Sequence, residues 1–173
     1  MAGRYDAIIL MGPPGSGKSF LGRYLSQQAI MSYVELEPIL RKRFGTGEEF
    51  RAQIQEVGAF LVRSYRDQLA RSVLPVAIES TGVSDRPIVE RLMRDHRVAI
   101  VRVKADRAVC VDRVVSRPSG KNISETADRE VVGRFYDLWL EKVAPTFSFD
   151  LEVDGTDAEA AANSIRAFLD TCP

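Results

Sequence analysis

Short apolar runs alternate with longer stretches of helical periodicity along the whole chain. The runs at 7–11 and 98–101 have no polar residue at alternate positions. Strands that are covered by helices on both faces have this character. Strands that alternate with helices predict an α/β fold with a parallel sheet. The expected strands are 5–11, 32–36, 75–80, 98–103 and 149–153.

The stretches between these strands predict helices and one long loop. Residues 117–125 have no periodicity and contain turn residues, so we expect them to form a mobile segment. The final helix begins with a capping box made by Thr156 and Glu159, and Asp106 is expected to cap the helix that it precedes. The expected helices are about 18–30, 38–44, 49–72, 86–95, 106–116, 126–143 and 157–170.

Length and composition favour a single domain over residues 1–173. The 24 Lys and Arg residues balance 24 Asp and Glu residues, so no net charge attracts nucleic acid or an anionic membrane. Cys110 and Cys172 lie far apart and the chain has one His, which argues against a zinc site or a disulfide framework. The first apolar run is too short for a signal peptide or a membrane span. We expect a cytoplasmic protein that is a monomer or a weak homodimer.

The turn between the first strand and the first helix has the pattern G-x-x-x-x-G-K-[ST]. Its glycines allow backbone N–H groups to surround an anion at the positive end of a helix, which predicts a phosphate-binding loop. Lys18 is expected to reach the outer phosphates of a nucleotide, and the Ser19 hydroxyl is expected to bind Mg²⁺. The predicted nucleotide-binding residues of this segment are Gly12, Pro13, Pro14, Gly15, Ser16, Gly17, Lys18, Ser19 and Phe20.

Two glutamates follow the second predicted strand. Glu35 and Glu37 are two residues apart on a segment expected to be extended, with Pro38 keeping Glu37 out of the helix, so both side chains would point the same way. Ligands of open α/β sheets bind beyond the carboxyl ends of the strands. Two carboxylates there can hold Mg²⁺ through water, orient an acceptor hydroxyl and take its proton. The alternative is a pair of solvated glutamates.

This part of the chain resembles the shikimate kinases and, more broadly, the small P-loop metabolite kinases. The resemblance rests on Glu35-x-Glu37 followed by Gly45 and by 47–51, which reads Gly-Glu-Glu-Phe-Arg. It implies a three-layer P-loop fold of the nucleoside monophosphate kinase type, and transfer of the γ-phosphoryl group of ATP, with Mg²⁺, to a hydroxyl of a small molecule. By the resemblance Glu35 serves the magnesium side, Glu37 serves the substrate hydroxyl, and Arg51 binds an anionic group. Either glutamate remains a candidate for the general base.

The third strand ends in Glu79-Ser80-Thr81-Gly82. It resembles the strand end of the AAA-type polynucleotide-kinase-like and zeta-toxin-like P-loop kinases, which implies that Glu79 takes part in the magnesium network. Gly82 stands where shikimate kinases have a substrate-binding glycine turn. A structural role for Glu79, as a helix cap or as a partner of Ser16 or Lys18, is the alternative.

The stretch after the fourth strand resembles the lid of these kinases. The resemblance implies that Arg113 packs against adenine and that Arg117 meets the transferring phosphoryl group, with Lys121 as a possible second cation. On the next helix, Arg134 stands where the family often has a substrate-binding arginine. Solvated arginines are the alternative. A nucleoside, nucleotide or antibiotic-sugar acceptor, or a nucleotide-binding regulator or toxin-like protein with little turnover, remains open.

Overall fold

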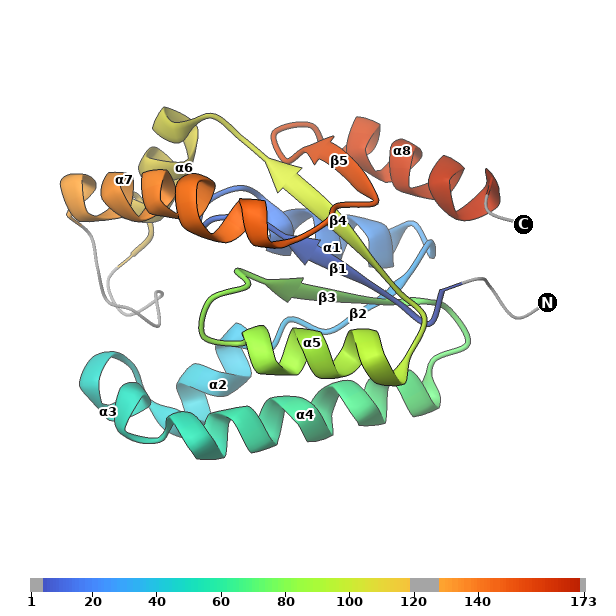
Figure 1. The fold of residues 1–173 in the computed structure, drawn as a ribbon, viewed down its shortest axis with the longest axis horizontal. Coiled ribbons are helices and arrows are strands. Elements are labelled where there is room, and N and C mark those ends of the chain that lie inside the picture. The colour runs from blue at the N-terminus through green and yellow to red at the C-terminus, as the bar shows by residue number, and fades with distance from the viewer. Residues whose placement is uncertain (1–4, 119–127, 172–173) are drawn as a thin grey trace.

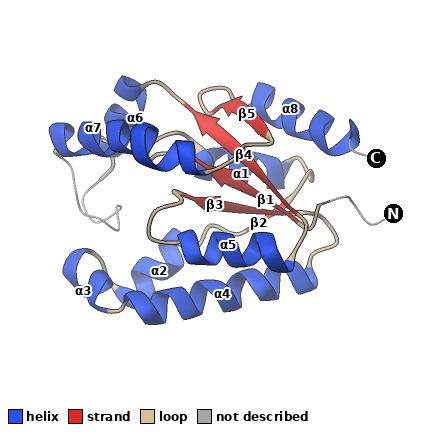
Figure 2. Cartoon of the chain, viewed as in Figure 1, coloured by secondary structure: helices blue, strands red, loops and turns tan. Residues whose placement is uncertain are grey.

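The computed structural model describes residues 5–118 and 128–171. In this part of the chain the strands form one five-stranded sheet in the order β2-β3-β1-β4-β5, and every neighbouring pair is parallel (Figure 2). The predicted α/β fold with a parallel sheet is therefore confirmed. The strands are β1 Ala7–Met11, β2 Ser32–Tyr33, β3 Val76–Ser80, β4 Val98–Lys104 and β5 Leu151–Asp154.

Helices cover both faces of the sheet (Figure 1). On one face α1 (Lys18–Gln27) and α8 (Ala158–Thr171) pack against Ile8 and Leu10 of β1. On the other face α4 (Ile54–Arg71) and α5 (Arg86–Asp95) enclose the alternate β1 residues. All five residues of β1 are fully buried, as its unbroken apolar composition predicts.

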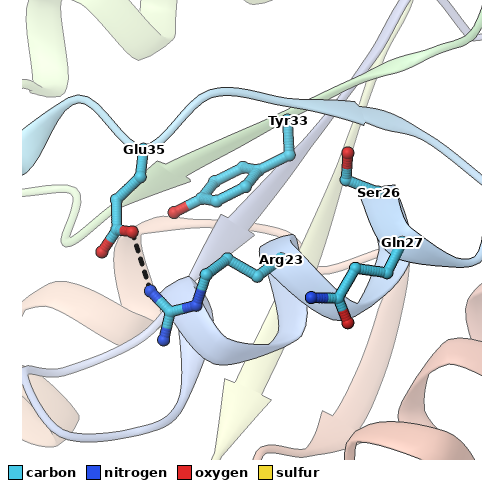
Figure 3. A pocket seen from close by; sticks show the side chains of 5 residues that line it. All are labelled: Arg23, Ser26, Gln27, Tyr33 and Glu35. Atoms are coloured by element: carbon cyan, nitrogen blue, oxygen red, sulfur yellow. Dashed lines mark hydrogen bonds and ion pairs between the residues drawn. The ribbon is translucent and has the colours of Figure 1, made fainter.

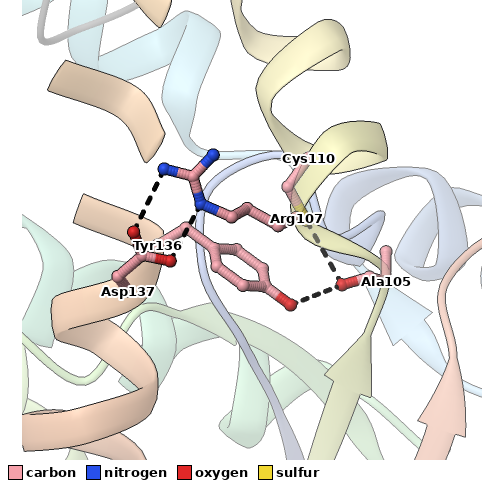
Figure 4. Close-up of polar contacts among 5 residues, drawn as sticks. All are labelled: Ala105, Arg107, Cys110, Tyr136 and Asp137. Carbon is pink, nitrogen blue, oxygen red and sulfur yellow. Dashed lines mark hydrogen bonds and ion pairs between the residues drawn. The ribbon is translucent and has the colours of Figure 1, made fainter. Parts of the chain in front are cut away.

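The remaining helices lie at or near the carboxyl edge of the sheet. Arg107 at the start of α6 (Arg107–Val115) donates two hydrogen bonds of 2.9 and 3.1 Å to Asp137 of α7 (Arg129–Leu138). The Tyr136 hydroxyl of α7 donates to the Ala105 carbonyl at 2.9 Å (Figure 4). These bonds fix α7 against the segment that follows β4. The helices are α2 Glu37–Phe44, α3 Gly47–Ala52, α6 Arg107–Val115, α7 Arg129–Leu138, a π-helical turn Trp139–Val143 and a 3-10 turn Ala144–Thr146.

The second strand is shorter than predicted. β2 ends at Tyr33, Leu36 already has helical dihedral angles, and Glu37 is the first residue of α2. Pro38 is accommodated because the first helical turn needs no backbone donor from it. The expectation that Glu35 and Glu37 lie together on an extended segment is therefore wrong.

The single helix predicted over 49–72 is two helices. Gln53 interrupts them with φ and ψ of −109° and 24°, and its side-chain amide donates to the carbonyls of Phe44 (3.2 Å) and Glu49 (3.1 Å). Arg51 consequently lies in the last turn of the short helix α3, and not near the start of one long helix over 49–72 as predicted.

Two predicted caps also differ from the structure. Asp157, not Thr156, caps α8 by accepting a bond from the Ala160 N–H at 3.0 Å, while Thr156 donates to Asp154. Asp106 precedes α6 as predicted, but its side chain accepts no capping hydrogen bond.

Most of the predicted mobile segment 117–125 and the first residues of the helix predicted over 126–143 lie outside the described residues, and so does Lys121. Arg117 and Pro118 are described, and α7 begins at Arg129 after a cap by Asp128. Within 5–118 and 128–171, none of the helices is long and apolar enough to cross a membrane.

Candidate functional site

The phosphate-binding loop is fixed by close contacts between backbones. Gly15 and Gly17 have φ values of 82° and 104°, which only glycine adopts without strain. A Cβ atom on Gly15 would collide with the backbone of Cys110 in α6, and one on Gly17 would collide with the Gly155 carbonyl after β5. The loop glycines are thus required twice, by the turn itself and by the elements packed behind it.

Lys18 lies inside the loop with 8% of its surface exposed. Its Nζ donates to the carbonyls of Gly12 and Pro13, both at 2.8 Å, and to Ser16 Oγ at 3.4 Å. Burial lowers the pKa of Lys18 to about 8, although the charge of Glu79 opposes this shift. Because neutral carbonyls compensate a buried cation only in part, this ammonium group is suited to bind an anion.

The hydroxyl of Ser19 donates to Glu79 Oε2 at 2.6 Å, and the Tyr33 hydroxyl donates to Oε1 of the same carboxylate at 3.0 Å. The described contacts thus join Glu79 to the residue predicted to bind Mg²⁺ rather than to the following helix. No group of three or more His, Cys, Asp or Glu within the described residues could hold a metal alone. Mg²⁺ commonly uses one or two protein oxygens together with phosphates and water, so Ser19 and Glu79 fit the ion as partners of a bound nucleotide.

The two predicted acceptor glutamates have different surroundings. Glu35 forms a 2.8 Å ion pair with Arg23 of α1, and both side chains are partly exposed (Figure 3). Glu37 lies in the first turn of α2, where the helix dipole favours a carboxylate. The two carboxylates therefore lie on different kinds of backbone, one before α2 and one in its first turn, and not on the single extended segment that the alternation pattern predicted.

The arginines predicted for the lid lie at the end of α6. Arg113 Nη1 donates to the carbonyls of Gly15 and Gly155, both at 3.2 Å, and so ties the phosphate-binding loop to the turn after β5. Arg117 is exposed two residues after α6 ends, and its charge contributes to the lowered pKa of Lys18. Both arginines thus lie near the loop, and their contacts with a nucleotide stay predictions.

The other predicted substrate residues are more dispersed. Gly82 has φ of 68°, and a Cβ there would lie 2.8 Å from the ring of Phe147, so packing already requires this glycine. Arg51 is exposed on α3, and Arg134 is exposed on α7 at 4.0 Å from Glu130. Phe20, predicted to line the nucleotide site, is 55% exposed in the first turn of α1.

Asp85 is a functional candidate that the sequence did not indicate. It occupies the cap position of α5 but makes no capping bond, and its Oδ1 is buried without a donor among the described residues. Burial raises the pKa of this carboxyl group, while Ser80, Gly82 and the charge of Lys18 act in the opposite direction. An aspartate directly before a helix normally indicates a helix cap, so nothing in the sequence suggested Asp85 as a functional residue.

The sequence matches a known family over most of its length. The profile of a family described as AAA domain matches residues 8–138. The chain belongs to this AAA-domain family. The cytidylate kinase of Aeropyrum pernix is 30% identical in sequence to this AAA-domain protein. The match covers 94% of this chain and 96% of that kinase. The family members it resembles are small P-loop kinases of the shikimate, cytidylate and adenylate kinase type.

Two further similarities concern shikimate kinases. The enzyme of Corynebacterium jeikeium is 24% identical to this AAA-domain protein, covering 94% of this chain and 87% of that one. The solved structure of shikimate kinase from Bacteroides thetaiotaomicron has a TM-score of 0.68 at 15% identity, covering 95% of this chain and 98% of that chain. This likeness confirms the predicted three-layer P-loop fold.

Proposed function

We propose that this protein transfers the γ-phosphoryl group of ATP to a hydroxyl group of a small metabolite. The observation that carries the proposal is the arrangement of Lys18 and Ser19, one buried inside the loop and the other bonded to Glu79 at 2.6 Å. This arrangement offers a cation to the outer phosphates and two oxygen ligands to Mg²⁺. The kinase relatives favour phosphoryl transfer over nucleotide binding with little turnover.

On the nucleotide side, the N–H groups of the loop bind the phosphates, and Lys18 exchanges its carbonyl partners for phosphate oxygens. Ser19 and Glu79 hold Mg²⁺, which when bound neutralises charge on the transferring phosphoryl group. Arg113 supports the loop from behind and borders the adenine, and Arg117 neutralises charge from the lid.

On the acceptor side, Glu37 orients the reacting hydroxyl and takes its proton, as a general base does. Glu35 can serve the magnesium side only after it leaves Arg23. Arg51 and Arg134 bind an anionic group of the acceptor, and the turn at Gly82 borders it. These roles extend the resemblance to the shikimate kinases.

A nucleoside monophosphate is the second candidate acceptor. It is favoured by the cytidylate kinase relative, whose match to this chain is nearly complete. The two acceptors demand different chemistry, because a phosphate oxygen is already anionic at neutral pH and needs no general base. Dependence of the rate on a carboxylate therefore separates them.

The test is ADP release by the purified protein with ATP and Mg²⁺, in the presence of shikimate, deoxyadenosine, CMP or AMP, against a control without acceptor. Because ADP forms from ATP in every case, phosphorus NMR must distinguish a new phosphate monoester from a second nucleoside diphosphate that appears as the CMP or AMP signal is lost. A new monoester supports the proposal, and a diphosphate formed in addition to the ADP from ATP supports the second candidate. Nucleotide binding without acceptor-dependent ADP release across a wider panel of alcohols would instead indicate a regulator.

A further inference from the structure

The carboxylate of Glu79 is held at both oxygens by hydroxyl groups from different elements. Ser19 of α1 donates to Oε2 at 2.6 Å, and Tyr33 of β2 donates to Oε1 at 3.0 Å. A carboxylate fixed at one oxygen alone can rotate about its last torsion, whereas two donors define its plane. The second donor, Tyr33, has no role in the function proposed above.

The sheet places Tyr33 beside Glu79. Tyr33 is the register partner of Ala77 in the parallel pairing of β2 with β3, and Glu79 follows Ala77 by two residues. Side chains two apart on a strand point to the same face, so Tyr33 and Glu79 both extend toward α1. The short strand β2 therefore delivers a phenol hydroxyl to the carboxylate at the end of β3.

The ring of Tyr33 also depends on a glycine of α1. A Cβ atom added at Gly22 would lie 2.6 Å from Cε2 and 2.8 Å from Cδ2 of the Tyr33 ring. Figure 3 shows the ring lying over α1, between Glu35 and Ser26. Glycine in the middle of a helix costs stability relative to alanine, and here its lack of a side chain makes room for the tyrosine.

We propose that Tyr33 is a positioning residue that orients Glu79 toward the Mg²⁺ ion of the bound nucleotide. The inference rests on the proposed function, because it takes Ser19 and Glu79 as the magnesium side of the site. Residues that hydrogen-bond a metal-side carboxylate fix its orientation, and their loss typically reduces metal affinity by about 10- to 100-fold. Tyr33 donates to Oε1 of Glu79, and the other carboxylate oxygen, Oε2, accepts from the Ser19 hydroxyl.

The test is Tyr33→Phe, which removes the hydroxyl and keeps the ring. Calorimetry with a non-hydrolysable ATP analogue, titrated with and without Mg²⁺, measures how much the ion strengthens binding without any turnover. We expect the affinity for Mg²⁺ in the complex to fall about 10- to 100-fold, while the affinity for the metal-free analogue is unchanged. Tyr24→Phe, which removes a tyrosine hydroxyl from α1 instead of β2, is the matched control and should match wild type.

Gly22→Ala provides a second variant that leaves Tyr33 itself intact. The added methyl group displaces the ring, so Mg²⁺ affinity should fall as it does in Tyr33→Phe. Unchanged Mg²⁺ affinity in Tyr33→Phe would overturn the inference, whatever Gly22→Ala does. Wild-type protein that bound the analogue equally well with and without Mg²⁺ would overturn the magnesium role of Ser19 and Glu79, and with it this role for Tyr33.

Discussion

The part of the protein proposed to bind the nucleotide, residues 12–20 with Cys110, Arg113 and Gly155, and the part proposed to bind the acceptor, residues 35–53, are held in place by different means. We call them the nucleotide half and the acceptor half. In the nucleotide half, the backbone of the loop lies directly against the backbones of Cys110 and Gly155, and Arg113 bonds to two of its carbonyls. In the acceptor half, side chains fix the course of the chain, such as Gln53 between α3 and α4. The contacts of the first kind exclude any side chain larger than glycine at Gly15 and Gly17, whereas the contact of the second kind depends on one amide side chain.

Lys18→Met should have the largest effect, because it removes the only buried ammonium group described in the nucleotide half. We expect phosphoryl transfer to fall by about 10³-fold or more, as when a preorganised donor to transition-state charge is lost. Circular dichroism and the melting temperature should stay near wild type, because the buried charge does not support the core. Equal turnover by the variant would show that the loop has no catalytic role.

Glu37→Gln tests whether the acceptor half contributes to chemistry as well as to binding. If Glu37 takes the proton of a hydroxyl, kcat should fall by about 10²-fold with little change in KM for ATP. Steady-state kinetics with the best acceptor of the panel measure both constants. Nearly unchanged kcat would favour an acceptor that is already anionic, such as a nucleoside monophosphate.

The two halves also differ in how much of their structure could be predicted from the sequence. The loop needs glycines at fixed positions, so its pattern predicted the turn, whereas the burial of Lys18 and the hydrogen bond from Ser19 to Glu79 are seen only in the structure. Most strands followed from their apolar runs. The end of β2 did not, because Pro38 suits both an extended segment and a first helical turn, and burial of Leu36 and Leu40 accompanies the helix.

Two other features of the structure could not be predicted from the local sequence. The break at Gln53 involves neither glycine nor proline, and depends on an amide that reaches two carbonyls. Asp85 has the sequence context of an ordinary helix cap, and only the structure shows that its carboxylate is turned elsewhere. Side-chain contacts between distant residues decide such features, and a single sequence does not display them.

Arg51→Ala should affect binding of the acceptor and leave the nucleotide half unchanged. A hydrogen bond to a charged group contributes roughly 1.5–3 kcal/mol, so KM for an anionic acceptor should rise at least about 10-fold while KM for ATP stays constant. Arg51→Lys should restore binding only in part, because lysine lacks two parallel donors. Arg63→Ala, an exposed change on α4, is the control. An unchanged acceptor KM would remove Arg51 from the site and favour an uncharged acceptor.

Asp85→Asn tests whether the buried carboxyl group of Asp85, whose charge interacts with that of Lys18, lowers stability at neutral pH. Burial raises the pKa of Asp85, so the folded state holds this proton more tightly than the unfolded state. The stability that the protonated carboxyl group of Asp85 gives the folded state is therefore fully present below the ordinary pKa of 3.8. It is lost as the pH rises through the pKa of the folded state. The variant should gain about 1–2 kcal/mol in the free energy of unfolding at neutral pH. Urea unfolding should show this gain shrinking toward pH 3.8; a gain independent of pH would contradict the role of charge.

Gly58→Ala should have the smallest effect and the opposite sign to any change in the loop glycines. A Cβ atom at Gly58 meets nothing within 4 Å outside its own helix, whereas one at Gly15 meets the backbone of Cys110. Gly58 lies inside α4, and alanine in a helix interior is favoured over glycine by about 0.5–1 kcal/mol. Thermal unfolding should therefore show a slightly more stable protein with unchanged kinetics for ATP. A loss of stability would mean that α4 is as tightly enclosed as the loop, and the contrast between backbone-fixed and side-chain-fixed halves would fail.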